Sequence, residues 1–246
     1  GFARPRFNGG WHSPYNPTEV NFNFTEANAW QYSLFYPQGN LGGELFEQRL
    51  NELFTTNTGT TGRQQSDITG LIGQYAHGNE PSHNYAYLFN RTTTPWKTQY
   101  YVNEIMTSFY HNAPDGLIGN EDCGQMSAWY VMSALGLYQV CPGKPEYDFG
   151  SAIFDTAVIT LENNKKIRII TKNKSANSPY LKSVSWNKQL FPSLQIPHAT
   201  LMQGGELVFE FNEQKLNAQP SSDSIPTAGL IAPVISGPGN SFTDKT

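Results

Sequence analysis

The sequence of 246 residues contains only two cysteines and few charged residues. Charged residues make up 15% and aromatic residues 13% of the chain, which excludes the charge-rich, aromatic-poor composition of a disordered protein. No basic run marks a nucleic-acid-binding surface, and no apolar run approaches the roughly 20 residues that cross a bilayer. Cys123 and Cys141 are too few for a disulfide framework. We expect two buried free thiols, with a single disulfide bond as the alternative.

The N-terminal end shows neither an initiating methionine nor a signal-peptide pattern. We therefore expect a processed or truncated chain whose targeting segment lay upstream. The composition is that of a folded protein of secreted type, so we expect a secreted or periplasmic location.

Helical periodicity dominates the first part of the chain, after a long loop rich in Gly, Pro and aromatic residues. Thr25 and Asp67 are the expected helix N-caps, and Gly136 is the expected C-terminal stop. Apolar spacing predicts helices over 25–36, 42–54, 67–77, 82–89, 95–111 and 123–136. Helices that alternate with polar loops are typical of an α/α barrel, so residues 1–145 are predicted to be mainly α.

The pattern changes to β-strands in the second part. Alternating or β-branched runs predict strands over 152–161, 166–171, 180–186 and 206–211, with a hairpin turn at Asn163–Asn164. Residues 146–213 are therefore expected to form a small antiparallel β module, which makes the chain α+β overall. Residues 214–246 are rich in Ser, Pro and Gly and are expected to be a tail.

Three polar clusters contain the residues that could perform chemistry. They lie at 23–31 with Glu26, at 77–83 with Glu80, and at 119–125 with Asp122, each beside an expected helix terminus. Helix N-termini stabilise carboxylates, and a glycosidase needs two carboxyl groups, one as acid and one as base or nucleophile. The residues alone leave ordinary roles open: a first-turn acid at Glu26, a helix cap at Asp122 and a loop acid at Glu80. The histidines do not have zinc-motif spacing.

Several long motifs in order resemble glycoside hydrolase family 92, the calcium-dependent exo-α-mannosidases. They lie at 5–11, 23–32, 61–75, 76–83, 95–98, 115–130 and 135–143, and include Thr-Glu-Ala-Asn-Ala-Trp, His-Gly-Asn-Glu-Pro-Ser and Gly-Asn-Glu-Asp-Cys-Gly. The resemblance covers about residues 1–160 well and the β module loosely.

The resemblance implies an inverting hydrolase that removes terminal α-linked mannose from glycans such as N-glycans. Glu26 is then the general acid and Asp122 the general base. Asn79 and Glu80 are implied as ligands of a calcium ion. The residues implied in substrate binding are Trp30, Gln31, His77, His83, Asn120 and Glu121. Two positions depart from the family pattern, because some members have Asp in place of Asn120 and many have His in place of Asn84.

Family members are much longer, with an N-terminal β-sandwich before an (α/α)6 barrel. The chain therefore resembles the C-terminal part of that barrel. Apolar faces that include Leu45, Phe46, Leu50, Phe54, Ile105, Met106 and Phe109 are expected to need partners on more than one side. We expect a second polypeptide with the β-sandwich and the remaining helices. Two alternatives stay open: another (α/α)6 glycosidase, and an inactive sugar-binding or structural fragment.

Overall fold

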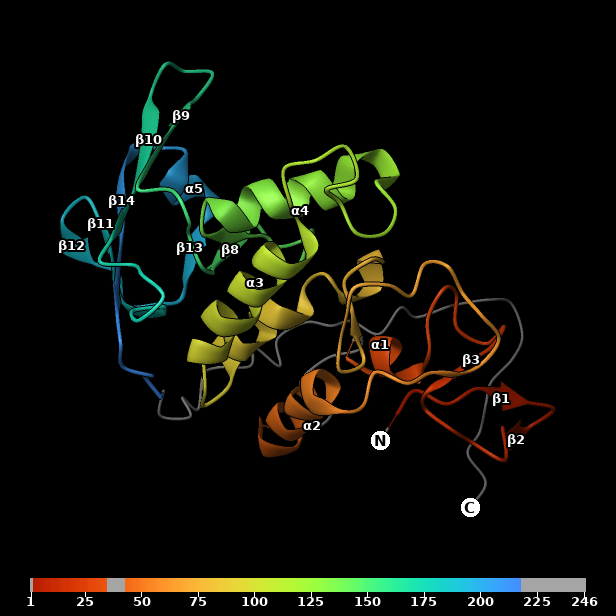
Figure 1. Ribbon diagram of the computed structural model, residues 1–246. Coiled ribbons are helices and arrows are strands. Elements are labelled where there is room, and N and C mark those ends of the chain that lie inside the picture. The colour runs from red at the N-terminus through yellow and green to blue at the C-terminus, as the bar shows by residue number, and fades with distance from the viewer. Residues whose placement is uncertain (1, 35–42, 218–246) are drawn as a thin grey trace, which may run out of the picture.

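The computed structural model describes residues 2–34 and 43–217. Figure 1 shows two long helices, α3 (Trp96–Phe109) and α4 (Gln125–Ala134), between a β-sheet region and a set of N-terminal loops. Helices α1 (Ala29–Ser33) and α2 (Gly43–Thr55) lie below them in that view. Short strand pairs organise the loops: β1 (Arg6–Phe7) with β2 (Gly10–Trp11), and β3 (Glu19–Val20) with β4 (Thr61–Gly62). None of the described helices is long and apolar enough to cross a membrane.

Helix α1 begins later than the sequence predicts, because Asn28 and not Thr25 is its N-cap. The Asn28 side chain accepts from Trp30 N, and the Gln31 side chain accepts from Asn28 N at 2.7 Å. This reciprocal capping box satisfies two helix-start donors. Glu26 therefore lies in the loop before the helix and not in its first turn. The expected end of this helix at residue 36 lies outside the described residues.

The helix predicted over 67–77 is wrong. The segment forms a hairpin of β5 (Leu71–Ile72) and β6 (Tyr75–Ala76). Gly70 and Gly73 both have φ of +61°, and a Cβ atom on Gly73 would lie 2.4 Å from the Leu53 carbonyl oxygen. Glycine is the residue that adopts this backbone without strain, so these glycines override the helical spacing of the apolar residues.

The remaining helices follow their predicted apolar spacing. Two 3₁₀ helices, η3 (Tyr85–Arg91) and η4 (Asp122–Gly124), cover the segments before α3 and α4, and Gly136 follows α4 with φ of +81°. The apolar faces are mostly covered within the chain itself, which removes much of the reason given for a second polypeptide. Leu45 is 60% exposed and Phe109 is partly buried, whereas the other members of that set are buried: Phe46, Leu50, Phe54, Ile105 and Met106.

The second part of the chain forms a five-stranded sheet with the order β12-β11-β14-β10-β9. The strands are β9 (Thr156–Thr160), β10 (Lys166–Lys172), β11 (Tyr180–Trp186), β12 (Gln189–Leu190) and β14 (Gly205–Asn212). The predicted strands are present, and a turn at Asn163–Asn164 joins β9 to β10. The fully antiparallel prediction is wrong, because β10 pairs with β14 in parallel. The chain passes through β11, β12, β13 (Gln195–Pro197) and the short helix α5 (His198–Leu201) before β14 returns beside β10.

A three-stranded sheet connects the two parts. It contains β7 (Leu137–Tyr138), β8 (Glu146–Phe149) and β13 (Gln195–Pro197) in the order β13-β8-β7. Buried Asp148 of β8 accepts two hydrogen bonds from Arg91, at 2.8 and 3.1 Å, and a third at 3.2 Å from Gln195. The chain as a whole combines helices and sheets, which agrees with the predicted α+β class. The described helices are only part of what a closed (α/α)6 barrel requires, so the barrel stays a prediction, as do the boundaries at 145 and 213.

Both cysteines are free and exposed. The expected free thiols are confirmed, but their expected burial is wrong. Cys123 lies in η4 and Cys141 lies in the loop between β7 and β8, so neither contributes to a core.

Candidate active site

Glu26 lies on an exposed loop that Asn79 holds in place. The Asn79 side-chain nitrogen donates to the Glu26 carbonyl oxygen at 3.1 Å and to its carboxylate at 3.3 Å. Asn79 is only 4% exposed, whereas the Glu26 side chain is open to solvent. Glu26 has φ of +54°, a left-handed conformation that non-glycine residues adopt at a cost and that often marks functional loops.

The second and third polar clusters meet through two glycines. Gly119 has φ of +75°, and a Cβ atom there would lie 2.2 Å from the Gly78 carbonyl oxygen. Gly78 is the neighbour of Asn79, so this close backbone contact brings the segment before Asp122 beside the segment that holds Glu26. The three clusters that the sequence singled out therefore converge on one region.

Asp122 does not cap α4, which excludes the ordinary role considered for it. The N-cap residue of α4 is Gly124, and a free donor of the first turn is satisfied by Glu121, whose carboxylate accepts from Ser127 N at 3.1 Å and from the Ser127 hydroxyl. Asp122 is exposed, and within the described residues its carboxylate makes no hydrogen bond or ion pair. The next residue, Cys123, has φ of +52°. An acceptor-only carboxylate on a constrained loop suits a general base.

Asn120 is linked to a residue that the site prediction missed. Its side-chain nitrogen donates to the Asp67 carboxylate, which also accepts from Gln65. Asp67 was expected to cap a helix, but no helix forms there. The sequence feature that could have identified Asp67 is its position as the only acid in the polar stretch 61–67, inside the family motif at 61–75.

His77 and His83 form a buried network under this region. Tyr75 and Tyr110 hydroxyls lie 2.7 and 2.6 Å from the two ring nitrogens of His77. His83 Nε2 donates to the His77 carbonyl oxygen at 2.9 Å, and Gln125 lies 3.4 Å from its Nδ1. Burial holds the pKa of His77 well below its usual value and lowers the pKa of His83 to about 4. Both rings are therefore neutral near pH 7.

Trp30 and Gln31 lie in the protein core. Trp30 is 6% exposed and packs edge-on against Phe2 with ring centroids 4.5 Å apart. Gln31 completes the capping box and donates to the Gln74 carbonyl oxygen at 2.6 Å. These contacts are structural, and a substrate-binding role for either residue stays a prediction.

Asn79 and Glu80 can supply part of a calcium site. The Asn79 nitrogen points to Glu26, which leaves its side-chain oxygen for another partner, and the Glu80 carboxylate has no hydrogen bond or ion pair among the described residues. Oxygen donors of this kind fit calcium, which takes about six to eight of them. The described residues contain no group of three or more acidic, His or Cys side chains suited to a metal ion. Further ligands would be carbonyl groups, water, sugar hydroxyls or residues outside the part of the protein that this structure describes.

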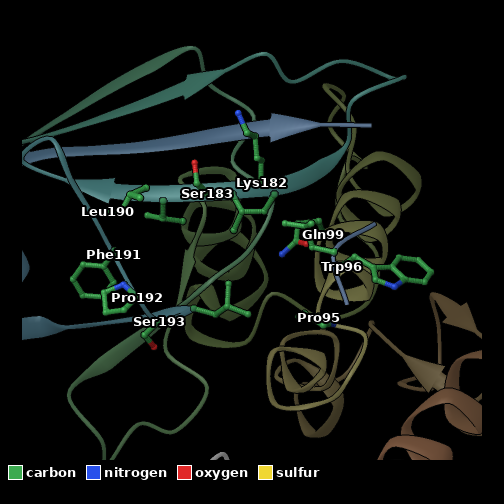
Figure 2. A pocket seen from close by; sticks show the side chains of 13 residues that line it. Pro95, Trp96, Gln99, Lys182, Ser183, Leu190, Phe191, Pro192 and Ser193 are labelled. Atoms are coloured by element: carbon green, nitrogen blue, oxygen red, sulfur yellow. The ribbon is translucent and has the colours of Figure 1, made fainter. Parts of the chain in front are cut away.

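A separate cavity of about 350 Å³ lies between the start of α3 and the β11–β12 edge. Figure 2 shows Trp96, Gln99, Leu190 and Phe191 around it. Its walls contain no residue of the three polar clusters, so this cavity is not part of the candidate active site.

Comparisons with known proteins agree with the motifs. The model of the glycosyl hydrolase family 92 catalytic domain matches residues 1–213. A search of curated proteins finds no match.

Solved structures of family GH92 enzymes are also similar to this chain. The family GH92 α-mannosidase BT3965 from Bacteroides thetaiotaomicron, in complex with mannoimidazole, is 35% identical with a TM-score of 0.80, over 87% of this chain and 30% of that one. The family GH92 inverting mannosidase BT2199 from Bacteroides thetaiotaomicron VPI-5482 is 32% identical with a TM-score of 0.75, over 89% of this chain and 32% of that one. This chain thus spans about a third or less of those proteins.

Proposed function

The chain belongs to glycosyl hydrolase family 92, and we propose that it supplies the general acid and the general base of an exo-α-mannosidase. The observation that carries this proposal is the convergence of three sequence-distant segments: Asn79 holds Glu26, and Gly78 contacts Gly119 beside the Asp122 loop. Family membership disfavours another kind of (α/α)6 glycosidase.

The proposed reaction uses two carboxyl groups in different roles. Glu26 donates a proton to the glycosidic oxygen as the bond to the anomeric carbon breaks. Asp122 accepts a proton from water as that water attacks the opposite face of the sugar, which inverts the anomeric configuration. Inverting pairs stand about 6.5–9.5 Å apart to admit the water, and we propose this separation for Glu26 and Asp122.

Asn79 and Glu80 are proposed to hold calcium through their side-chain oxygens. When bound, the ion would supply positive charge that orients mannose hydroxyls and the attacking water. His77, His83, Asn120, Glu121, Trp30 and Gln31 are proposed to shape the mannose pocket. The buried network suggests that His77 and His83 do so by supporting the loops.

Full activity is proposed to require the part of the family enzymes that this chain does not span. That part contains the β-sandwich and the rest of the barrel in the family architecture. A second polypeptide as its carrier has no support from the structure and stays a prediction, as does secretion or a periplasmic location.

Hydrolysis of an aryl α-mannoside tests the proposal. The assay uses a polypeptide that joins this chain to the β-sandwich and the remaining barrel helices of the family, which we call the full-length polypeptide. Activity that chelation removes and added calcium restores is expected. Activity that survives exhaustive chelation would contradict the calcium site, and hydrolysis of α-glucosides in place of α-mannosides would contradict the substrate.

A further inference from the structure

The cavity of about 350 Å³ between the start of α3 and the β11–β12 edge has no part in the proposed reaction. Most of its wall residues are apolar, and they come from α3, from β11 and from the segment that follows β12. One of them, Leu190, is 77% exposed. Ligand pockets are lined in this way and have volumes from about 300 Å³ upwards. We call this feature the α3–β11 cavity.

One polar group in the α3–β11 cavity lacks a partner. Gln99 of α3 is 2% exposed, and its side-chain nitrogen has no hydrogen-bond partner among the described residues. Figure 2 shows the Gln99 amide directed toward the space between β11 and the segment that contains Phe191 and Ser193. A buried amide without a hydrogen bond is costly. A backbone carbonyl group of a bound peptide would accept from it, so the cavity suits an apolar peptide.

The chain reaches the α3–β11 cavity directly after its last strand. The Lys215 ammonium lies 4.2 Å from the Trp96 ring centroid and 5.6 Å from that of Tyr180, and such cation–π contacts hold a lysine in place. Leu216 forms part of the cavity wall and is 43% exposed. Figure 1 shows the stretch beyond β14 beside the start of α3. The sequence after residue 217 therefore continues from the cavity itself.

That sequence contains one segment with the chemistry of the cavity. Residues 218–246 are rich in Ser, Pro and Gly, but residues 228–235 read Ala-Gly-Leu-Ile-Ala-Pro-Val-Ile without a polar side chain. Its aliphatic side chains match the apolar walls. Proline favours an extended backbone in the residue before it, and extended proline-containing segments bind in aromatic-lined grooves.

The short connection makes a weak interaction sufficient. Residues 218–227 separate the apolar segment from the cavity wall. A random coil of that length spans roughly 16–19 Å on average, and an extended chain at most about 35 Å. A tether this short gives an effective concentration of about 1 mM or more, so a segment with a Kd near 0.1 mM is mostly bound.

We propose that residues 228–235 of this chain bind in the α3–β11 cavity. Their aliphatic side chains contact its apolar walls, and one of their backbone carbonyl groups accepts from Gln99. The bound segment covers Leu190 and Leu216. The proposal does not depend on the proposed function, because the catalytic loops contribute no residue to this cavity.

A synthetic peptide of residues 226–237 tests the proposal by competition. Calorimetric titration compares the full-length polypeptide with the same polypeptide shortened to end at Asn217. We expect a Kd of about 0.1 mM for the shortened form and at least about tenfold weaker binding to the intact form, whose own segment fills the cavity. In the shortened form, Leu190→Ser should weaken binding about tenfold. Val158→Ser is the control, on the opposite edge strand β9, where Val158 is 55% exposed, and it should leave the Kd unchanged.

Equal binding to both forms, no binding to either, or no effect of Leu190→Ser would overturn the proposal. A second measurement decides the matter if the shortened polypeptide does not fold. Benzoylphenylalanine at position 190 of the intact form should cross-link on illumination to residues 228–235 of the same molecule, and at position 158 it should not. Mass spectrometry identifies the products in a mixture with an isotope-labelled copy. Cross-links between two copies, or none to residues 228–235, would contradict the proposal.

Discussion

The amide of Asn79 donates to both the carbonyl oxygen and the carboxylate of Glu26, 53 positions earlier in the chain. Hydrogen bonds to charged groups contribute about 1.5–3 kcal/mol, and each 1.4 kcal/mol corresponds to about a tenfold change in rate. Asn79→Ala should therefore lower kcat about ten- to a hundredfold at saturating calcium. Steady-state kinetics check this, with exposed Asn217→Ala as the control. An unchanged kcat would show that Glu26 is held in another way.

Replacement of Glu26 by Gln should affect substrates according to their leaving groups. A general acid contributes about 10²- to 10⁴-fold where the departing oxygen needs a proton. We expect a loss of that size on α-mannobiose and a much smaller loss on α-mannosyl fluoride. Similar losses on the two substrates would assign Glu26 a role other than proton donation.

The buried, neutral state of His83 predicts a pH dependence of stability. Because burial lowers its pKa from 6.5 to about 4, the unfolded chain binds more protons between these values. The contribution of neutral His83 to the free energy of unfolding is then fully present above pH 6.5. It is lost as the pH falls toward 4, by about 3 kcal/mol at most. The midpoint of thermal unfolding, Tm, should fall less steeply with decreasing pH over this window in His83→Gln than in the unmodified protein. The exposed His111→Gln variant should keep the slope of the unmodified protein, and an unchanged slope in His83→Gln would refute the assignment.

The Arg91–Asp148 pair should be a main determinant of stability between the helical part and the β-sheets. Asp148 is fully buried, and burial raises its pKa while Arg91 opposes the shift. Arg91→Met leaves the carboxylate without its cation, which should cost about 3–5 kcal/mol. Lys182→Met, which breaks the exposed pair with Glu210 at 2.7 Å, should cost about 0–1 kcal/mol. Denaturant unfolding measures both, and equal effects would contradict the account.

The sequence predicts the long regular elements well and the non-local contacts poorly. Helices α2, α3 and α4 and the main strands follow from the periodicity of buried residues such as Leu50, Ile105 and Phe209. The 67–77 segment has helical spacing too, but Gly70 and Gly73 adopt a left-handed backbone. The need for glycine at position 73 comes from its close approach to the Leu53 carbonyl oxygen, a tertiary contact that the local sequence does not contain. The parallel pairing of β10 with β14 depends on a crossover that no local pattern contains.

The candidate site shows the same division. Motifs identify Glu26, Asn79 and Asp122 as residues of interest, but their roles depend on contacts between distant segments. The hydrogen bond from Ser127 N to Glu121 at the start of α4 and the bond between Asn120 and Asp67 are both of this kind. They could not be read from the spacing of residues along the chain.

The central claim is that Glu26 and Asp122 are the acid and base of an inverting α-mannosidase. Proton NMR of the first product formed from an α-mannoside by the full-length polypeptide tests it most directly. The account predicts that β-mannose appears first and that Asp122→Asn abolishes its formation. If α-mannose appears first, or if Asp122→Asn retains normal turnover, the claim is contradicted.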